Sequence, residues 1–305
     1  MEKPLVSVVM CTWNGDRYLK EQVDSILAQD YENFELVISD DASTDETKEI
    51  LKYYEAHPKT KIFYQENNIG LIKNFAFATE KSKGSFIAYS DQDDIWLKHK
   101  LAKLVTSIGN SALVYSDSLL TDENGKSLDK KLSDLRNMYS GEDSRGYIFY
   151  NCVWGHGMMI RRDAAERSLP MPNTIHHDVW LAFKAFTLGG IVYLDEVLTL
   201  YRQHQSSSSK TLPQKVEARK ASKRWEDYLK QLDWIRLMYE NERPAYQPFY
   251  KEFLELYRTK EKGKFSGELF WFMMKNRKSL FILSKKNMIS QVVEILKQAR
   301  GESNS

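Results

Sequence analysis

Long apolar runs are missing from this chain of 305 residues. No stretch approaches the ~18 apolar residues of a membrane-spanning helix, and the first residues, MEKPLVSVVMCTWNG, lack the apolar stretch of a signal peptide. The two cysteines, Cys11 and Cys152, are too few for a disulfide framework or a zinc cluster. We therefore expect a cytoplasmic protein in a reducing compartment.

A strong excess of one charge is also missing, because the formal net charge is only +2. The basic residues in excess lie in 251–305, and the preceding residues are acidic on balance. This distribution argues against a nucleic-acid-binding protein with a basic reading face. The apolar fraction of 42% is large enough for a folded core.

Apolar runs that resemble buried strands alternate with segments of helical spacing in the first third of the chain. The strand-like runs are Leu5–Cys11, Phe34–Asp40, Lys61–Gln65 and Ser85–Asp91. This order predicts an α/β domain whose mostly parallel sheet has helices on both faces, and such sheets bind ligands at the carboxyl ends of their strands. We expect this domain over residues 1–212, with a polar loop at 121–146, a polar joint at 203–213 and a helical C-terminal region at 213–305.

The acidic stretch DDASTDET, residues 40–47, follows the second expected strand. Ser43 or Thr44 can cap the next helix, and the acids after them suit its N-terminus. Helix capping does not account for Asp40 and Asp41, the two acids at the end of the strand. One of them can point inward and accept a hydrogen bond from a nucleobase imide or a ribose hydroxyl.

The stretch SDQDDIW follows the fourth expected strand. Asp91 and Asp93 are one residue apart on an extended segment, so both can reach one divalent cation that also binds phosphate oxygens. The alternative to a cation site is an acidic turn that is exposed to solvent and binds no ligand. An EF-hand is excluded because its glycine and closing glutamate are missing.

Two later stretches carry further polar groups. In HHDVWLAF, Asp178 can cap the helix that follows, or it can act as a general base, because Trp180 and His177 would partly shield its carboxylate from water. In LYRQHQSSSSK, Arg202, His204 and Lys210 can bind a diphosphate or form a solvated basic loop.

Over Leu5 to Gln205 the sequence resembles a bacterial family 2 glycosyltransferase. The matching stretches are SVVMCTWNGDRYLKEQVDSILAQDYENFELVISDDASTDET, NNIGLIKNFAFA, GSFIAYSDQDDIW, HHDVWLAF and YLDEVLTLYRQH. SDQDDIW together with HDVW and YRQH resembles the rhamnosyltransferase-like branch, which builds cell-wall and capsule polysaccharides. The resemblance implies the GT-A fold.

The resemblance also implies roles for residues at matching positions. Thr12 and Asn14 would line the nucleotide pocket, and Asp41 would contact the base. Asp91 and Asp93 would form the D-x-D motif that holds Mn²⁺ or Mg²⁺, with Asp93 as the first choice for a direct ligand. Asp178 would be the catalytic base, and Arg202 and His204 would lie near the diphosphate. The acceptor region would comprise Asp94, Trp96, His156, His177 and Trp180.

Two positions depart from the family pattern. His177-Asp178 stands where Glu-Asp is common, and His156 stands where a small or hydroxyl residue is common. The activity implied is inverting, metal-dependent transfer of a sugar, L-rhamnose first, from a dTDP- or UDP-linked donor to a glycan or lipid-linked acceptor. Homo-oligomers are compatible with the sequence. The basic and aromatic segment 266–300 indicates either a helical bundle packed on the catalytic domain with a solvated basic face, or peripheral contact with the inner face of the cell membrane.

Other functions make different demands on the sequence. A nucleotidyltransferase should have a glycine-rich loop ending in Arg or Lys near the N-terminus, and CTWNGDRY does not match it. A phosphoacceptor signalling domain needs its acids after the first strand. A protein that binds nucleotide sugars or polysaccharides without turnover remains open, although it would not need both the D-x-D motif and Asp178.

Overall fold

The computed structural model describes residues 3–204 and 221–302. The chain forms two compact units: Met1–Glu142 with Val153–Ser209, and Asp143–Cys152 with Lys210–Ser305. The second unit thus includes Asp143–Cys152, which the sequence analysis placed in the first domain. The boundary expected at residue 212, and Lys210, lie outside the described residues.

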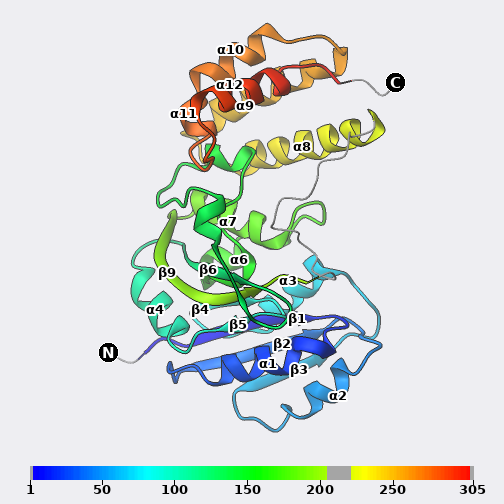
Figure 1. The fold of residues 1–305 in the computed structure, drawn as a ribbon, viewed down its shortest axis with the longest axis vertical. Coiled ribbons are helices and arrows are strands. Elements are labelled where there is room, and N and C mark those ends of the chain that lie inside the picture. Colours follow the sequence, from blue (N-terminus) through cyan, green and yellow to red (C-terminus); the bar gives the residue numbers. More distant parts are fainter. Residues whose placement is uncertain (1–2, 205–220, 303–305) are drawn as a thin grey trace. The chain divides into compact units, whose positions relative to one another are not determined.

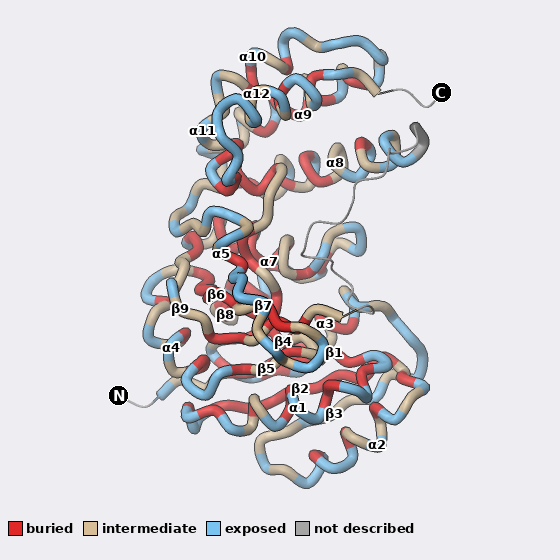
Figure 2. Tube along the Cα trace, in the orientation of Figure 1, coloured by how far each residue is buried: buried red, intermediate tan, exposed pale blue. Residues whose placement is uncertain are grey.

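Four parallel strands form one half of the sheet in the first unit (Figure 1). β1 (Val6–Thr12) lies between β2 (Phe34–Asp40) and β4 (Phe86–Ser90), and β3 (Thr60–Tyr64) pairs with β2. Every residue of β1 and β2 is buried (Figure 2). The continuous apolar runs read from the sequence are therefore strands covered on both faces.

Helices cover both faces of these strands. Leu36 and Ile38 of β2 share a core with Leu19 and Leu51, from the helices that follow β1 and β2. Ser39 points to the opposite face, because side chains alternate along a strand. The helices of this unit are α1 (Asp16–Leu27), α2 (Thr47–Lys52), α3 (Leu71–Lys81), α4 (Lys100–Ser107), α5 (Leu132–Leu135), α6 (Arg162–Glu166) and α7 (His177–Thr187).

The other half of the sheet contains antiparallel pairs. β8 (Met158–Arg161) runs antiparallel to both β4 and β6 (Leu113–Thr121), and β9 (Ile191–Arg202) runs parallel to β6. β5 (Ile95–Trp96) is antiparallel to β9, and β7 (Ser127–Lys131) is antiparallel to β6. The strand order is β3-β2-β1-β4-β8-β6-β9-β5, so the sheet is parallel in its first half and mixed as a whole.

The direction of β8 has a consequence for the polar edge of the sheet. Ala88 of β4 pairs with Met159 of β8, so the first residue of β8 lies beside the last residues of β4. The 3₁₀ turn before β8, η2 (Gly155–Gly157), therefore reaches the edge at which β1, β2 and β4 end.

The second unit is helical in its described part. An aromatic core holds α9 to α10, with the rings of Phe253 and Phe272 5.6 Å apart. Its elements are η1 (Ser144–Ile148), α8 (Ala221–Asn241), α9 (Gln247–Arg258), η3 (Thr259–Lys262), α10 (Gly267–Lys275), α11 (Arg277–Leu280) and α12 (Met288–Gln298). Within the described ranges, no helix has the length and apolar character needed to cross a membrane.

Candidate active site

A cleft of about 1250 Å³ opens at the carboxyl edge of the sheet in the first unit. It is larger than the ~300–1000 Å³ typical of small-molecule pockets, so a nucleotide and an attached sugar fit together. The segments that follow β1, β2, β3, β4 and β9 all contribute to it. Its lining includes Thr12, Trp13, Asn14, Asp41, Lys48, Asn68, Phe75, Asp91, Gln92, Asp93 and His204.

The loops after β1 and β2 are joined by hydrogen bonds around Asp40, which is fully buried. Asp40 Oδ1 accepts from the hydroxyls of Thr12 at 3.0 Å and Ser43 at 2.5 Å. The Ser43 oxygen in turn accepts from the Asn14 backbone N–H at 2.9 Å, and Asn14 Oδ1 accepts from the Thr44 N–H at 2.9 Å. Asp40 is thus the acid that points inward, and neither Ser43 nor Thr44 caps α2.

Asp41 fixes the loop between β3 and α3. Its carboxylate accepts from the backbone N–H groups of Ile69 at 2.7 Å and Gly70 at 2.9 Å. Gly70 has a φ of 86°, which glycine adopts without strain. A carboxylate has about four lone-pair sites, so Asp41 can accept further hydrogen bonds from a ligand in the cleft that it lines.

Asp93 and Arg202 lie at the acidic loop after β4. Asp93 Oδ2 is 2.8 Å from His204 Nε2, and both residues line the cleft. Arg202 is 3% exposed and is not among the described residues that line the cleft. It donates to the Asp93 carbonyl at 2.9 Å and to Glu21 at 2.5 Å. In this structure Arg202 therefore anchors the acidic loop.

Gln92 and Trp13, which the sequence analysis did not select, connect the acidic loop to the loop after β1. Gln92 Oε1 accepts from the Trp13 N–H at 2.9 Å, and Gln92 Nε2 donates to the Trp13 carbonyl at 3.2 Å. The Trp13 side chain is 55% exposed and lines the cleft. A large exposed aromatic ring in a cleft was the available signal, but exposure cannot be read from the sequence.

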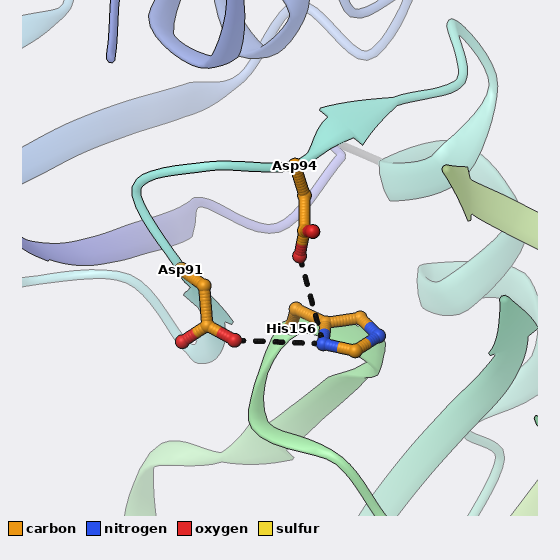
Figure 3. A group of neighbouring side chains, drawn as sticks. All are labelled: Asp91, Asp94 and His156. Carbon is orange, nitrogen blue, oxygen red and sulfur yellow. Dashed lines mark ion pairs between the residues drawn. The ribbon is translucent and has the colours of Figure 1, made fainter. Parts of the chain in front are cut away.

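Asp91, Asp94 and His156 form a group behind the acidic loop, and Figure 3 shows their side chains converging. His156 Nδ1 is 3.5 Å from Asp91 Oδ2 and 3.6 Å from Asp94 Oδ2. Asp94 and His156 are buried, whereas the Asp91 side chain is 37% exposed and lines the cleft. His156 is in η2, so the antiparallel direction of β8 brings it here.

The two carboxylates of this group differ in charge environment. Burial, and then the charges of Asp93 and Asp91, raise the pKa of Asp94 well above its usual value. Burial alone would raise the pKa of Asp91, but hydrogen bonding and charge at His156, with smaller contributions from more distant cations, lower it. Asp94 Oδ1 accepts from the Arg202 N–H at 3.0 Å. Asp94 Oδ2 has no hydrogen-bond partner in the described part of the chain.

A fully buried lysine, Lys100, lies beside this group. Its ammonium donates to the His156 carbonyl and to the Thr199 hydroxyl, and it stands 3.7 Å from the centre of the Trp96 ring. Burial lowers the pKa of Lys100 well below its usual value, against the charges of the nearby acids.

Asp178 is in the first turn of α7, and its Oδ1 accepts from the Val179 N–H at 2.8 Å. The adjacent His177 is buried, and its ring stacks 3.9 Å from that of Phe75, which lines the cleft. A Cβ at Gly155 would lie 2.8 Å from His177 Nε2, so this glycine lets η2 approach α7. Asp178 thus lies close to the cleft without being one of its lining residues.

The remaining acceptor-region residues are core side chains. Trp96 is 3% and Trp180 4% exposed, and the Trp180 indole donates to the Ser168 carbonyl at 2.7 Å. Neither indole belongs to the described cleft lining. The structure therefore gathers Thr12, Asn14, Asp41, Asp91, Asp93 and His204 at the cleft, and their functional roles stay predictions.

Comparisons with known proteins give three findings. The family model described as "Glycosyl transferase family 2" matches residues 7–169. TuaG of Bacillus subtilis (strain 168), a glycosyltransferase assigned provisionally to teichuronic acid biosynthesis, is 31% identical in an alignment of 215 residues that covers 68% of this chain and 82% of TuaG. EpsE of the same organism, also named provisionally as a glycosyltransferase, is 32% identical in an alignment of 192 residues that covers 59% of this chain and 66% of EpsE.

Solved structures share the fold at low sequence identity. S. aureus TarS 1-349 in complex with UDP-GlcNAc has a TM-score of 0.60 and 17% identity, with 96% of this chain and 81% of that chain covered. The mannosyltransferase PcManGT from Pyrobaculum calidifontis, in complex with GDP-Man and Mn²⁺, has a TM-score of 0.56 and 17% identity, with 98% and 86% covered. These likenesses concern the fold.

Proposed function

The chain belongs to glycosyl transferase family 2, and from this premise we propose that it moves a sugar from a nucleotide diphosphate to a hydroxyl of a glycan or lipid-linked acceptor. The GT-A fold expected from the sequence is confirmed by the likeness to glycosyltransferase structures. The main support for the proposal is that one cleft is lined by the exposed Trp13, by the carboxylate of Asp41 and by the Asp93–His204 pair.

The base of the donor would lie between Trp13 and Asp41. An aromatic face stacks on any nucleobase, and the Trp13 side chain is more than half exposed. Asp41 has lone pairs left after binding two backbone N–H groups, and a pyrimidine imide N–H can donate to one of them. Thymine and uracil both present this group, so a dTDP- or UDP-linked donor fits this contact.

Asp93 and His204 fit a divalent cation at the diphosphate end of the donor. Their oxygen and nitrogen, 2.8 Å apart, form a mixed donor set that suits Mn²⁺ better than Mg²⁺, because Mg²⁺ prefers oxygen ligands alone. When bound there, the ion would neutralise the diphosphate and the charge that grows on it as it leaves. Asp91 is turned toward His156, so in this proposal Asp93, and not Asp91, holds the cation of the donor.

Asp178 would take the proton from the acceptor hydroxyl. An inverting transfer needs that proton to be removed as the hydroxyl attacks the anomeric carbon. The first turn of α7 holds the carboxylate through its contact with the Val179 N–H, which leaves the second oxygen for the proton. Arg202 would act as a positioning residue, because it holds the backbone of the acidic loop.

The sugar we propose first is L-rhamnose from dTDP-rhamnose, on the basis of the motif resemblance alone. Two proteins with this fold have been solved with UDP-GlcNAc and with GDP-Man plus Mn²⁺. Those complexes support a nucleotide-sugar donor and leave the base open.

A thermal-shift screen of dTDP-, UDP- and GDP-sugars, each with and without Mn²⁺, tests donor choice and metal together. We expect the largest shift with a pyrimidine sugar in the presence of Mn²⁺. A coupled assay for nucleoside diphosphate release then tests turnover. A larger response to GDP-sugars would overturn the base assignment, and donor binding without release in the presence of candidate acceptors would favour a binding protein.

We also propose that α12 contacts the inner face of an anionic membrane. Its described residues present an exposed apolar row, with Met288 61%, Ile289 76%, Val293 44% and Leu296 40% exposed. Lysines flank this row at 285, 286 and 297. An apolar helix face bordered by cations suits an anionic lipid surface, where each cation contributes about 1 kcal/mol.

A further inference from the structure

The imidazole of His156 stands between two carboxylates at distances that allow only long, weak hydrogen bonds. Its Nδ1 is 3.5 Å from Asp91 and 3.6 Å from Asp94, whereas charge-assisted bonds of this kind measure about 2.7–2.9 Å. On the other side of the ring, Nε2 is 3.0 Å from the Ser118 hydroxyl. A proton on Nε2 that bonds to Ser118 leaves a lone pair on Nδ1, directed at two acids.

Asp94 is the second observation that points to a ligand. Its side chain is fully buried, and its Oδ2 faces the group without a hydrogen-bond partner among the described residues. Leaving a buried carboxylate oxygen unsatisfied costs free energy. A cation placed between Oδ2 and the ring would satisfy the oxygen and the Nδ1 lone pair at once.

The spacing of the three atoms matches a small metal ion. The candidate ligand atoms of Asp91, Asp94 and His156 all lie within 4.8 Å of one another (Figure 3). Two ligands of a tetrahedral ion with bonds of about 2.0–2.1 Å stand roughly 3.3 Å apart. The two distances from Nδ1 exceed this value by only a few tenths of an ångström.

The local charge also matches a divalent ion. Asp91 and Asp94 bring two carboxyl groups to the site, and the amine of the buried Lys100 lies beside them. The guanidinium of Arg202 is paired with Glu21 at 2.5 Å. When both are ionised, Asp91 and Asp94 together carry the charge that one divalent cation neutralises.

From this geometry we propose a second metal site, at which Asp91 Oδ2, Asp94 Oδ2 and His156 Nδ1 bind a divalent transition-metal ion such as Zn²⁺. One imidazole and two carboxylates suit Zn²⁺ better than Mg²⁺. Asp91 is part of the cleft lining, so the fourth coordination position faces the cleft. Ser118, bonded to Nε2, orients the ring as hydrogen-bond partners of metal-bound histidines do. The site goes beyond the donor's cation, because Asp93 and His204 are not members of it.

Metal binding by the whole protein without nucleotide tests the site. The chain is stripped with a chelator, titrated with Co²⁺ as a spectroscopic substitute for Zn²⁺, and assayed for bound metal after dialysis. We expect about one equivalent on the wild-type chain, with the intense visible absorption of a tetrahedral ion. Asp94→Asn and His156→Gln should each weaken binding at least ~10-fold. Asp94→Asn keeps the oxygen that accepts from Arg202, and thermal unfolding checks that both variants fold.

Asp93→Asn and His204→Gln are the matched controls, and they should keep the bound equivalent. A wild-type chain that retains no metal overturns the proposal, and would mean that a proton on His156 balances the acids. If all variants bind the metal equally well, the proposal is wrong and the metal is held at adventitious surface sites. Loss of metal in the controls but not in Asp94→Asn would assign the ion to the cleft. Because no outcome depends on turnover, failure here leaves the glycosyltransferase proposal untouched.

Discussion

Polar side chains at the cleft divide into those that hold the backbone and those with bonding capacity left for a ligand. Asp40 and Arg202 belong to the first kind, because hydrogen bonds within the protein engage their polar groups. Trp13 and Asp41 belong to the second. This distinction decides which substitutions test function and which test folding.

Asp178→Asn tests the catalytic base. The amide keeps the oxygen that accepts from Val179, but it cannot take the acceptor proton, so transfer should fall by roughly 10²–10⁴-fold. The measurement is nucleoside diphosphate release with and without acceptor. Donor affinity and slow donor hydrolysis should stay near wild type. A variant that keeps more than a tenth of wild-type transfer would remove Asp178 from the role, and His177 would be tested next.

Trp13→Ala tests the base platform. Loss of stacking on one base should weaken nucleotide binding by about 1–3 kcal/mol, measured by calorimetric titration with the nucleoside diphosphate. The two bonds to Gln92 involve only the Trp13 backbone, so the loop should keep its conformation. Trp13→Phe is the control and should restore most of the affinity. Unchanged affinity in the alanine variant would place the base elsewhere in the cleft.

At the scale of elements, Glu35 joins the strands of the parallel half. It lies on β2, and its Oε1 accepts from the Ser7 hydroxyl of β1 at 2.7 Å and from the Lys83 N–H at 2.6 Å. Its Oε2 is paired with Lys61 of β3 at 2.5 Å. Burial alone would raise the pKa of Glu35, but these partners outweigh burial and lower it.

Glu35→Gln should therefore destabilise the fold in a pH-dependent way. A lowered pKa means that the charged form favours the folded state, so its contribution is fully present above the ordinary glutamate pKa of about 4.3 and is lost as the pH falls through the folded value. We expect a loss of about 2 kcal/mol in the free energy of unfolding at pH 7, measured by urea denaturation. The deficit should shrink in acid, and a constant deficit would refute the linkage.

The parallel half of the sheet could be predicted because its strands are buried on both faces and read as apolar runs. β6 was missed because LVYSDSLLT places Ser116, Asp117 and Ser118 inside a buried strand. Ser118 bonds to His156, far along the chain, and Asp117 accepts from the Ser133 N–H. The Ser116 hydroxyl has no hydrogen-bond partner within the described residues. The meeting of Asp94 with His156 likewise depends on β8 lying beside β4, a neighbour relation that no local pattern encodes.

At the scale of the whole molecule, the family model ends at residue 169, and α8 to α12 of the second unit lie beyond it. The aromatic and basic residues of 266–300 predicted a membrane-facing segment, and the structure adds which side chains are exposed. Whether that surface meets lipid stays a prediction, because an exposed apolar row also suits a protein partner.

Liposome flotation tests that surface. The protein should float with anionic vesicles at low salt and less so at high salt, because salt screens the attraction between lysines and lipid. Ile289→Ser with Val293→Ser should abolish recovery, since both remove exposed apolar area from α12. Leu229→Ser, which removes a 44% exposed leucine from α8, is the matched control and should still float. Absence of flotation at low salt would exclude lipid as the partner.

The hydrogen bonds that join Asn14, Asp40 and Ser43 bear on attempts to re-engineer the donor preference. If only the segment after β1 were exchanged with that of another glycosyltransferase, Ser43 and Asp40 would lose their present hydrogen-bond partners in that segment. A chimera should therefore transplant residues 12–15 and 40–47 as one cassette. For the same reason, natural divergence in base preference would require paired changes in both segments, which single-site libraries do not sample.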